Sequence, residues 1–170
     1  SQLSSAVSSR GSIKLLVRDA GGEPAERPPL EFRRADRSDA AAYERDIGTD
    51  SAWSFRRRLT EGTDCYLVLE DERILHASWT TTRTAWTSEL RAYLSPPPGD
   101  AYIYESFTRP ETRGRGIYPF ALGNICAELG GRGIRRVWVG VEPDNVPSIS
   151  AITKAGFAEA LELPFERKML

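Results

Sequence analysis

The sequence has 170 residues, of which 40% are hydrophobic and 28% are charged. This composition is typical of a globular protein, and the length fits one domain with its own core. With 23 Lys and Arg against 24 Asp and Glu, the formal net charge is −1, which argues against a nucleic-acid partner or an anionic membrane surface.

The first 29 residues are expected to form an N-terminal extension. Residues 1–11 are rich in serine and lack the apolar core of a signal peptide, so we expect partial disorder there and a cytoplasmic protein. Residues 13–17 have strand composition, but the glycines and prolines of residues 19–29 are typical of a linker. The domain proper is therefore expected over residues 30–170.

No membrane span or metal site is predicted. No apolar run approaches the roughly 20 residues that a spanning helix needs. The two cysteines, Cys65 and Cys126, are far apart and have no metal-ligand spacing, so we interpret them as small buried apolar side chains.

Apolar spacing and cap residues predict the elements of the first half. They are a strand over 30–34, helices over 38–46 and 51–59, and a hairpin with strands over 65–69 and 74–81. Residues 83–100 have no clear pattern and end in a proline-rich loop.

The second half alternates strands and helices. In chain order we expect a strand over 101–108, a helix over 115–129, a strand over 137–141, a helix over 147–155 and two terminal strands. This order predicts an α/β domain with a mixed sheet.

The most informative segment joins the strand over 101–108 to the following helix. Gly114 and Gly116 let the backbone approach an anion closely, and unpaired N–H groups at a helix start favour phosphate. Arg113 and Arg115 add positive charge for a pyrophosphate or a ribose phosphate. A plain loop is the alternative, because Gly131-Arg132-Gly133 repeats the same letters after a helix. The segment lacks the Gly-Lys-Ser/Thr of a P-loop and the third glycine of a dinucleotide fingerprint.

A second segment, over residues 141–157, favours the anion-binding interpretation over a plain loop. Together the two segments resemble the GNAT superfamily of acyl-CoA N-acyltransferases. Gly114 and Gly116 occupy the glycine places of the family's pyrophosphate motif, and a second family motif is matched by Asn145, Ser148, Lys154, Gly156 and Phe157. The resemblance covers about residues 30–165. It implies a mixed, mostly antiparallel central sheet flanked by helices, with a splayed strand pair that holds the acyl-CoA.

The resemblance also implies residue roles. Backbone at Phe107 and Thr108 would pair with the pantetheine arm of acetyl-CoA, and Asn145 and Ser148 would bind the same arm. Asn145 has a structural alternative as a turn or helix cap. The pyrophosphate would be held by the backbone amides of Arg113, Gly114, Arg115, Gly116, Ile117 and Tyr118.

Three positions depart from the family pattern. Glu111 replaces the Gln or Arg that opens the pyrophosphate motif, and Tyr118-Pro119 replaces small residues. Ile152 stands where many relatives carry a tyrosine that protonates the leaving thiolate, so that role is not transferred to it.

The attacking amine must lose a proton, and two residues are candidate bases. Glu105 is the first, and burial among neighbouring aromatic residues would raise its pKa; a carboxylate simply paired with an arginine is the alternative. His76 is the second, on a strand expected to face the acceptor, although a lone strand histidine is often structural. Trp53, Trp79 and Trp86 are candidates for an acceptor pocket, with at least one expected in the core.

These features predict an enzyme that moves an acetyl group from acetyl-CoA to an amine of a small molecule, such as an amino sugar or an amino acid, by direct attack. A homodimer is compatible with this reading. Two alternatives stay open: an acyl-CoA-binding module that has lost catalysis, and an aminoacyl transferase on a related fold, which would need a basic groove for tRNA.

Overall fold

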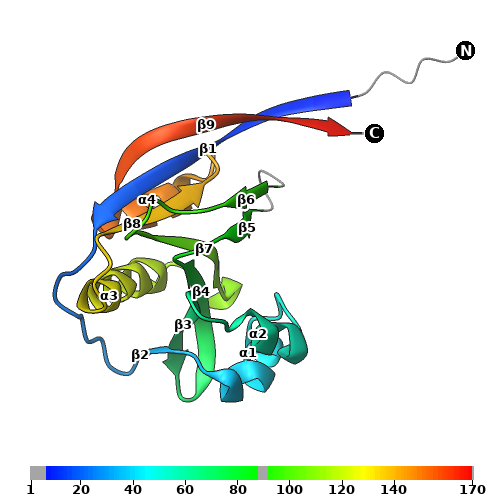
Figure 1. Ribbon diagram of the computed structural model, residues 1–170. Coiled ribbons are helices and arrows are strands. Elements are labelled where there is room, and N and C mark those ends of the chain that lie inside the picture. Colours follow the sequence, from blue (N-terminus) through cyan, green and yellow to red (C-terminus); the bar gives the residue numbers. More distant parts are fainter. Residues whose placement is uncertain (1–6, 88–91, 170) are drawn as a thin grey trace, which may run out of the picture.

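The computed structural model describes residues 7–87 and 92–169 and contains a central sheet with helices on both faces (Figure 1). The strands are β1 (Val7–Asp19), β2 (Glu31–Arg34), β3 (Thr63–Glu70), β4 (Arg73–Thr81), β5 (Ala85–Thr87), β6 (Ala92–Leu94), β7 (Ala101–Thr108), β8 (Arg136–Val141) and β9 (Ala158–Met169). The helices are α1 (Ala40–Asp46), α2 (Ala52–Arg58), α3 (Ile117–Gly131) and α4 (Val146–Lys154), with short 3-10 helices η1 (Arg37–Asp39) and η2 (Pro110–Thr112).

Seven strands form the main sheet in the order β2-β3-β4-β7-β8-β1-β9. Each neighbouring pair is antiparallel except β7 and β8, which are parallel. β5 and β6 pair separately as a small sheet within the segment that had no clear pattern. This mixed, mostly antiparallel sheet confirms the predicted fold class, and the β3–β4 hairpin and β7 lie where the sequence placed them.

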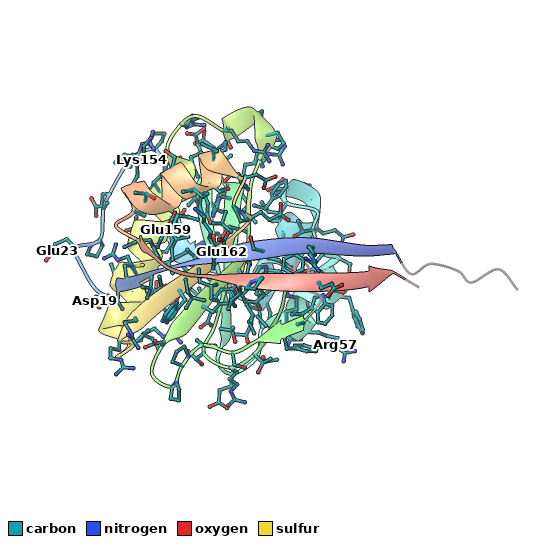
Figure 2. The ribbon with its side chains drawn as sticks, turned by 90° about the horizontal axis from the view of Figure 1, so that it is seen from above. Asp19, Glu23, Arg57, Lys154, Glu159 and Glu162 are labelled. Carbon is teal, nitrogen blue, oxygen red and sulfur yellow. The ribbon has the colours of Figure 1, made fainter. Side chains whose placement is uncertain are left out.

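The expectation that residues 1–29 form an extension outside the domain needs correction, because β1 lies inside the sheet. Its residues 14–19 pair with β8, and residues 7–17 pair with β9 on the other side. Figure 2 shows β1 and β9 side by side as a long ribbon that projects beyond the body of the domain. Lys14 forms an ion pair with Glu159 across this ribbon. The prediction of disorder concerned residues that include 1–6, which lie outside the described part of the chain.

The C-terminal prediction also needs correction. Within the described residues, one long strand, β9, follows α4 where two terminal strands were expected. A register shift between Leu15 and Leu16 of β1 lets the ribbon bend without ending the strand.

The helices cover opposite faces of the sheet. Tyr43 of α1 and Phe55 of α2 pack with Trp79 on one face. On the other face, α3 and α4 cover a core that includes Leu122 and Ile152. None of the helices in the described residues is long and apolar enough to span a membrane.

The feature that positions the site is the separation of β7 from β8. The two strands pair only from Ala101 to Ile103. Beyond Ile103, β7 continues to Thr108 beside β4, while β8 continues to Val141 beside β1. The parallel pair therefore splays, as the resemblance implied, and leaves an opening at the middle of the sheet.

Candidate active site

The turn before α3 has the backbone geometry that its glycines predicted. Gly114 has φ +86°, and Gly116, the N-cap of α3, has φ +71°. A Cβ added at Gly114 would meet no other atom within 4 Å, so this backbone faces open space. Across the described residues, no protein hydrogen bond is formed by the N–H groups of Gly114, Arg115 or Gly116. These groups can therefore donate hydrogen bonds to an anion, which the positive end of α3 also attracts.

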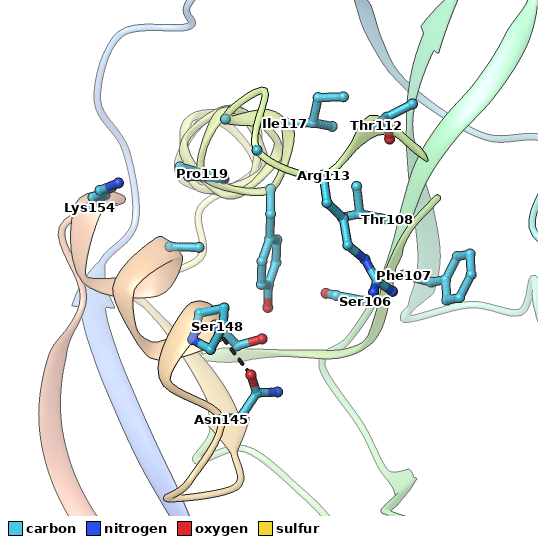
Figure 3. Close-up of a pocket in the computed structure, with 15 residues that line it drawn as sticks. Ser106, Phe107, Thr108, Thr112, Arg113, Ile117, Pro119, Asn145, Ser148 and Lys154 are labelled. Atoms are coloured by element: carbon cyan, nitrogen blue, oxygen red, sulfur yellow. Dashed lines mark hydrogen bonds between the residues drawn. The ribbon is translucent and has the colours of Figure 1, made fainter. Parts of the chain in front are cut away.

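A cavity of about 590 Å³ lies between this turn, the end of β7 and the start of α4. Figure 3 shows Ser106 and Thr108 of β7 on one side and Asn145 and Ser148 on the other. Nine of the ten predicted cofactor-binding residues line the cavity: Phe107, Thr108, Arg113, Gly114, Gly116, Ile117, Tyr118, Asn145 and Ser148. The structure thus brings together two segments that are about 30 residues apart in the chain.

Arg115 is the exception among the ten. Its guanidinium lies 2.7 Å from a carboxylate oxygen of Glu70, and its side chain does not line the cavity. The contribution of this side chain to phosphate binding stays a prediction, whereas Arg113 lines the cavity.

Asn145 is a helix cap that also lines the cavity. Its Oδ1 accepts a hydrogen bond of 3.3 Å from the N–H of Ser148, and this bond begins α4 (Figure 3). The structural alternative for Asn145 is therefore present, and the cap holds Asn145 and Ser148 at the cavity wall.

The strand β7 carries a β-bulge beside the cavity. Ala77 pairs with Phe107 and Trp79 pairs with Tyr104, so the two residues Glu105 and Ser106 lie opposite Ser78 alone. Glu105 has φ +46°, an uncommon value for a residue with a side chain. The bulge directs Glu105 away from the sheet core.

Glu105 is not buried, contrary to the expectation from the sequence. Its side chain is 48% exposed, and its carboxylate lies 2.7 Å from the Arg58 guanidinium. Arg58 also contacts Asp50 and lies 3.8 Å above the Trp79 ring. Burial opposes the charge of Arg58, but the nearby carboxylates raise its pKa, so Glu105 faces a permanent cation. Glu105 does line a second cavity, of about 300 Å³, in the opening between β7 and β8.

His76 is buried and faces the α3 side of the sheet, where its ring stacks on Tyr118 with centroids 5.3 Å apart. Its Nδ1 lies 2.6 Å from Thr108 Oγ1 and its Nε2 lies 2.7 Å from Ser78 Oγ. Burial lowers the pKa of His76 to about 3, so the ring is neutral. His76 therefore lies in the core and lines neither described cavity, which leaves Glu105 as the candidate base.

At least one tryptophan lies in the core, as expected, and Trp53, Trp79 and Trp86 line neither described cavity. Trp79 is fully buried, while Trp53 and Trp86 are 63% and 48% exposed. Both cysteines are free and buried, as predicted. Ile152 is fully buried in the core and lines neither described cavity.

Sequence reasoning missed Ser106 and Arg58. Ser106 lines both cavities, and its position two residues before Thr108 on a strand was a usable signal, since alternate residues share a face. Arg58 belongs to a run of three arginines at the end of α2, and nothing in that run distinguishes it.

No metal site is indicated, because no cluster of three or more candidate ligands occurs among the described residues.

Comparisons with known proteins agree with this geometry. The model of the acetyltransferase (GNAT) family matches residues 31–157. The chain therefore belongs to the GNAT acetyltransferase family. A sequence search of curated proteins found no match.

Solved structures show the same fold at low sequence identity. A GCN5-related N-acetyltransferase from Sphaerobacter thermophilus aligns with a TM-score of 0.65 and 16% identity over 93% of this chain and 51% of its own. The ribosomal-protein-S18-alanine N-acetyltransferase of Escherichia coli aligns with a TM-score of 0.61 and 14% identity over 83% of this chain and 96% of its own. AAC(6')-Iy, in complex with a bisubstrate analog of CoA and acetylneamine, aligns with a TM-score of 0.63 and 14% identity over 83% of this chain and 99% of its own. The chain spans about half the length of the Sphaerobacter protein.

Proposed function

We propose that the protein transfers an acetyl group from acetyl-CoA to an amine of a small molecule, such as an amino sugar or an amino acid, by direct attack. The single observation that carries this proposal is the amide-lined turn before α3, which opens onto the cavity beside the splayed strands. This turn suits a pyrophosphate, and the splay leaves one edge of β7 for the arm of the cosubstrate.

The residues present fit this cosubstrate. Gly114 leaves open space at the turn, the Arg27 guanidinium lies 3.3 Å from a Cβ built at Gly116, and Arg113 supplies a cation at the cavity. The cavity leads from the turn past Thr108 and Ser106, which also lines the second cavity between β7 and β8. A thioester delivered along this path would reach the opening where Glu105 lies.

Support for the acceptor class comes from the surroundings of the second cavity and from a relative. Glu105 and Glu142 both line that cavity, which favours a cationic amine. The bisubstrate analog in the AAC(6')-Iy structure joins CoA to an aminoglycoside fragment, which makes amino sugars the first acceptors to test. Glu105 would accept the amine's proton, directly or through water, from its place beside Arg58 at the second cavity.

We also propose that the protein works in the cytoplasm, without nucleic acid, membrane or metal, and a homodimer is compatible with the exposed edge of β9.

Two measurements test the function. Isothermal titration with acetyl-CoA should give a dissociation constant in the micromolar range, and no binding would refute the cofactor assignment. A mass-spectrometric screen over amino sugars, amino acids and diamines should then show acetylation of one class. Tight binding with no turnover on any amine would instead support an acyl-CoA-binding module.

A further inference from the structure

A continuous line of side-chain hydrogen bonds runs through the sheet beside the cavity. Thr108 bonds to His76, His76 bonds to Ser78, and Ser78 Oγ lies 2.8 Å from Ser106 Oγ. The β-bulge makes the last contact possible, because it turns Ser106 toward Ser78. Ser106 in turn hydrogen-bonds the hydroxyl of Tyr118. The line therefore ends at Tyr118, in the first turn of α3.

Tyr118 lies at the junction of the two cavities. It lines the large cavity beside the helix N-terminus and the smaller one in the strand opening. Its ring is held against His76. Because the large cavity is the proposed path of the pantetheine arm, the sulfur of a bound thioester would lie at this junction when its carbonyl carbon lies in the opening.

The direction of the hydrogen bonds matters for what Tyr118 can do. The His76 ring is neutral in the core, so one ring nitrogen donates a hydrogen bond and the other accepts one. If Nε2 donates to Ser78, then Ser78 donates to Ser106 and Ser106 donates to the Tyr118 oxygen. In that arrangement the Tyr118 proton is free to point into the cavity, and a tyrosinate would be stabilised by Ser106.

From this geometry we infer that Tyr118 is the general acid that protonates the departing CoA sulfur, with Ser106, Ser78 and His76 as positioning residues. The inference rests on the proposed function. The amine nitrogen forms a bond to the carbonyl carbon, and the C–S bond breaks with its electron pair on sulfur. The hydroxyl proton of Tyr118 moves to that sulfur, and the proton that Glu105 takes from the amine returns to the tyrosinate through solvent. The products are the amide and the free thiol.

The protonation state of Tyr118 agrees with this assignment. Burial raises the pKa of Tyr118, while the hydrogen bond to Ser106 partly offsets this rise. The hydroxyl is therefore protonated at neutral pH and can act as an acid.

The test is Tyr118→Phe, which removes only the hydroxyl, with Tyr66→Phe as the matched control. Tyr66 is also buried, and its hydroxyl bonds to Arg132 outside both cavities. With an acceptor from the amine screen, Tyr118→Phe should lower kcat by roughly 100-fold, in the range usual for general acid catalysis. The dissociation constant of acetyl-CoA should change less than threefold. Tyr66→Phe should retain the wild-type kcat.

Binding measurements test the inference independently of the acceptor. Wild-type protein should bind CoA several-fold more tightly than desulfo-CoA, because the hydroxyl contacts sulfur, and Tyr118→Phe should lose that preference. Equal kcat values for wild type and Tyr118→Phe would overturn the role of Tyr118. So would a preference of Tyr118→Phe for CoA over desulfo-CoA that equals that of wild type. Failure of wild-type protein to bind acetyl-CoA would instead refute the proposed function itself.

Discussion

Replacing Gly114 by alanine tests the anion-binding turn most directly. Gly114 has φ +86°, and an alanine in a left-handed conformation costs about 1–2 kcal/mol. The position is exposed and a Cβ there has no neighbour within 4 Å, so the free turn can relax away from the strained conformation. Binding of the diphosphate must then restore it.

The strain therefore appears in the affinity for acetyl-CoA. Since 1.4 kcal/mol corresponds to a tenfold change, we expect Gly114→Ala to weaken binding by roughly 5- to 30-fold. The melting temperature should change little, because the turn contributes no core contact.

Gly123 in α3 supplies the matched control. It also has no atom within 4 Å of a built Cβ, but its backbone is helical. Gly123→Ala should therefore raise stability by about 0.5–1 kcal/mol and leave the affinity unchanged. Titration calorimetry and thermal unfolding of both variants give the comparison. Equal affinities in the two variants would refute the claim that this turn holds the diphosphate.

Three further predictions follow from the charged groups. Arg113→Ala should weaken acetyl-CoA binding roughly tenfold, whereas Arg115→Ala should have little effect because that side chain pairs with Glu70; equal losses in titration would contradict this difference. Glu105→Gln should lower kcat at least tenfold and spare the affinity for acetyl-CoA, and a wild-type rate would remove Glu105 from the mechanism. His76 has an ordinary pKa of 6.5 when unfolded and about 3 when folded, so its contribution to stability is complete above pH 6.5 and is lost as the pH falls toward 3, by up to about 1.4 kcal/mol per pH unit. Urea unfolding at pH 7 and pH 4 should show a smaller loss for His76→Asn than for wild type, and equal losses would contradict the burial argument.

The cofactor side of the site could be predicted because its signals are local. Gly114 and Gly116 fix a turn by their own conformational freedom, and Asn145 caps the helix that follows it. Each feature depends on residues within a few positions in the chain, and the sheet then brings the two segments together.

The place of β1 could not be predicted in the same way. Residues 13–17 have strand composition, but their partners in β8 and β9 lie more than 120 residues further along the chain. Nothing in the linker that follows β1 indicates a return to the far side of the sheet.

The catalytic side of the site was harder to predict from the sequence, because it depends on the β-bulge in β7. Strand alternation alone would assign Glu105 and Ser106 to opposite faces, but the bulge changes where both point. Glu105 therefore reaches Arg58 at the surface instead of an apolar pocket. His76, expected to face the acceptor, packs instead on Tyr118 of α3.

The bulge and the splay are parts of one arrangement. Pairing of β7 with β8 ends at Ile103, two residues before the bulge begins at Glu105. The bulge bends β7, and a bent β7 is free to leave β8 and open the sheet. The same bend brings Ser106 to Ser78 and Tyr118, so the opening for the thioester and the hydrogen bonds behind Tyr118 arise together. A substitution that straightens β7 should therefore impair cosubstrate binding and proton transfer at once, whereas Tyr118→Phe should impair only the second.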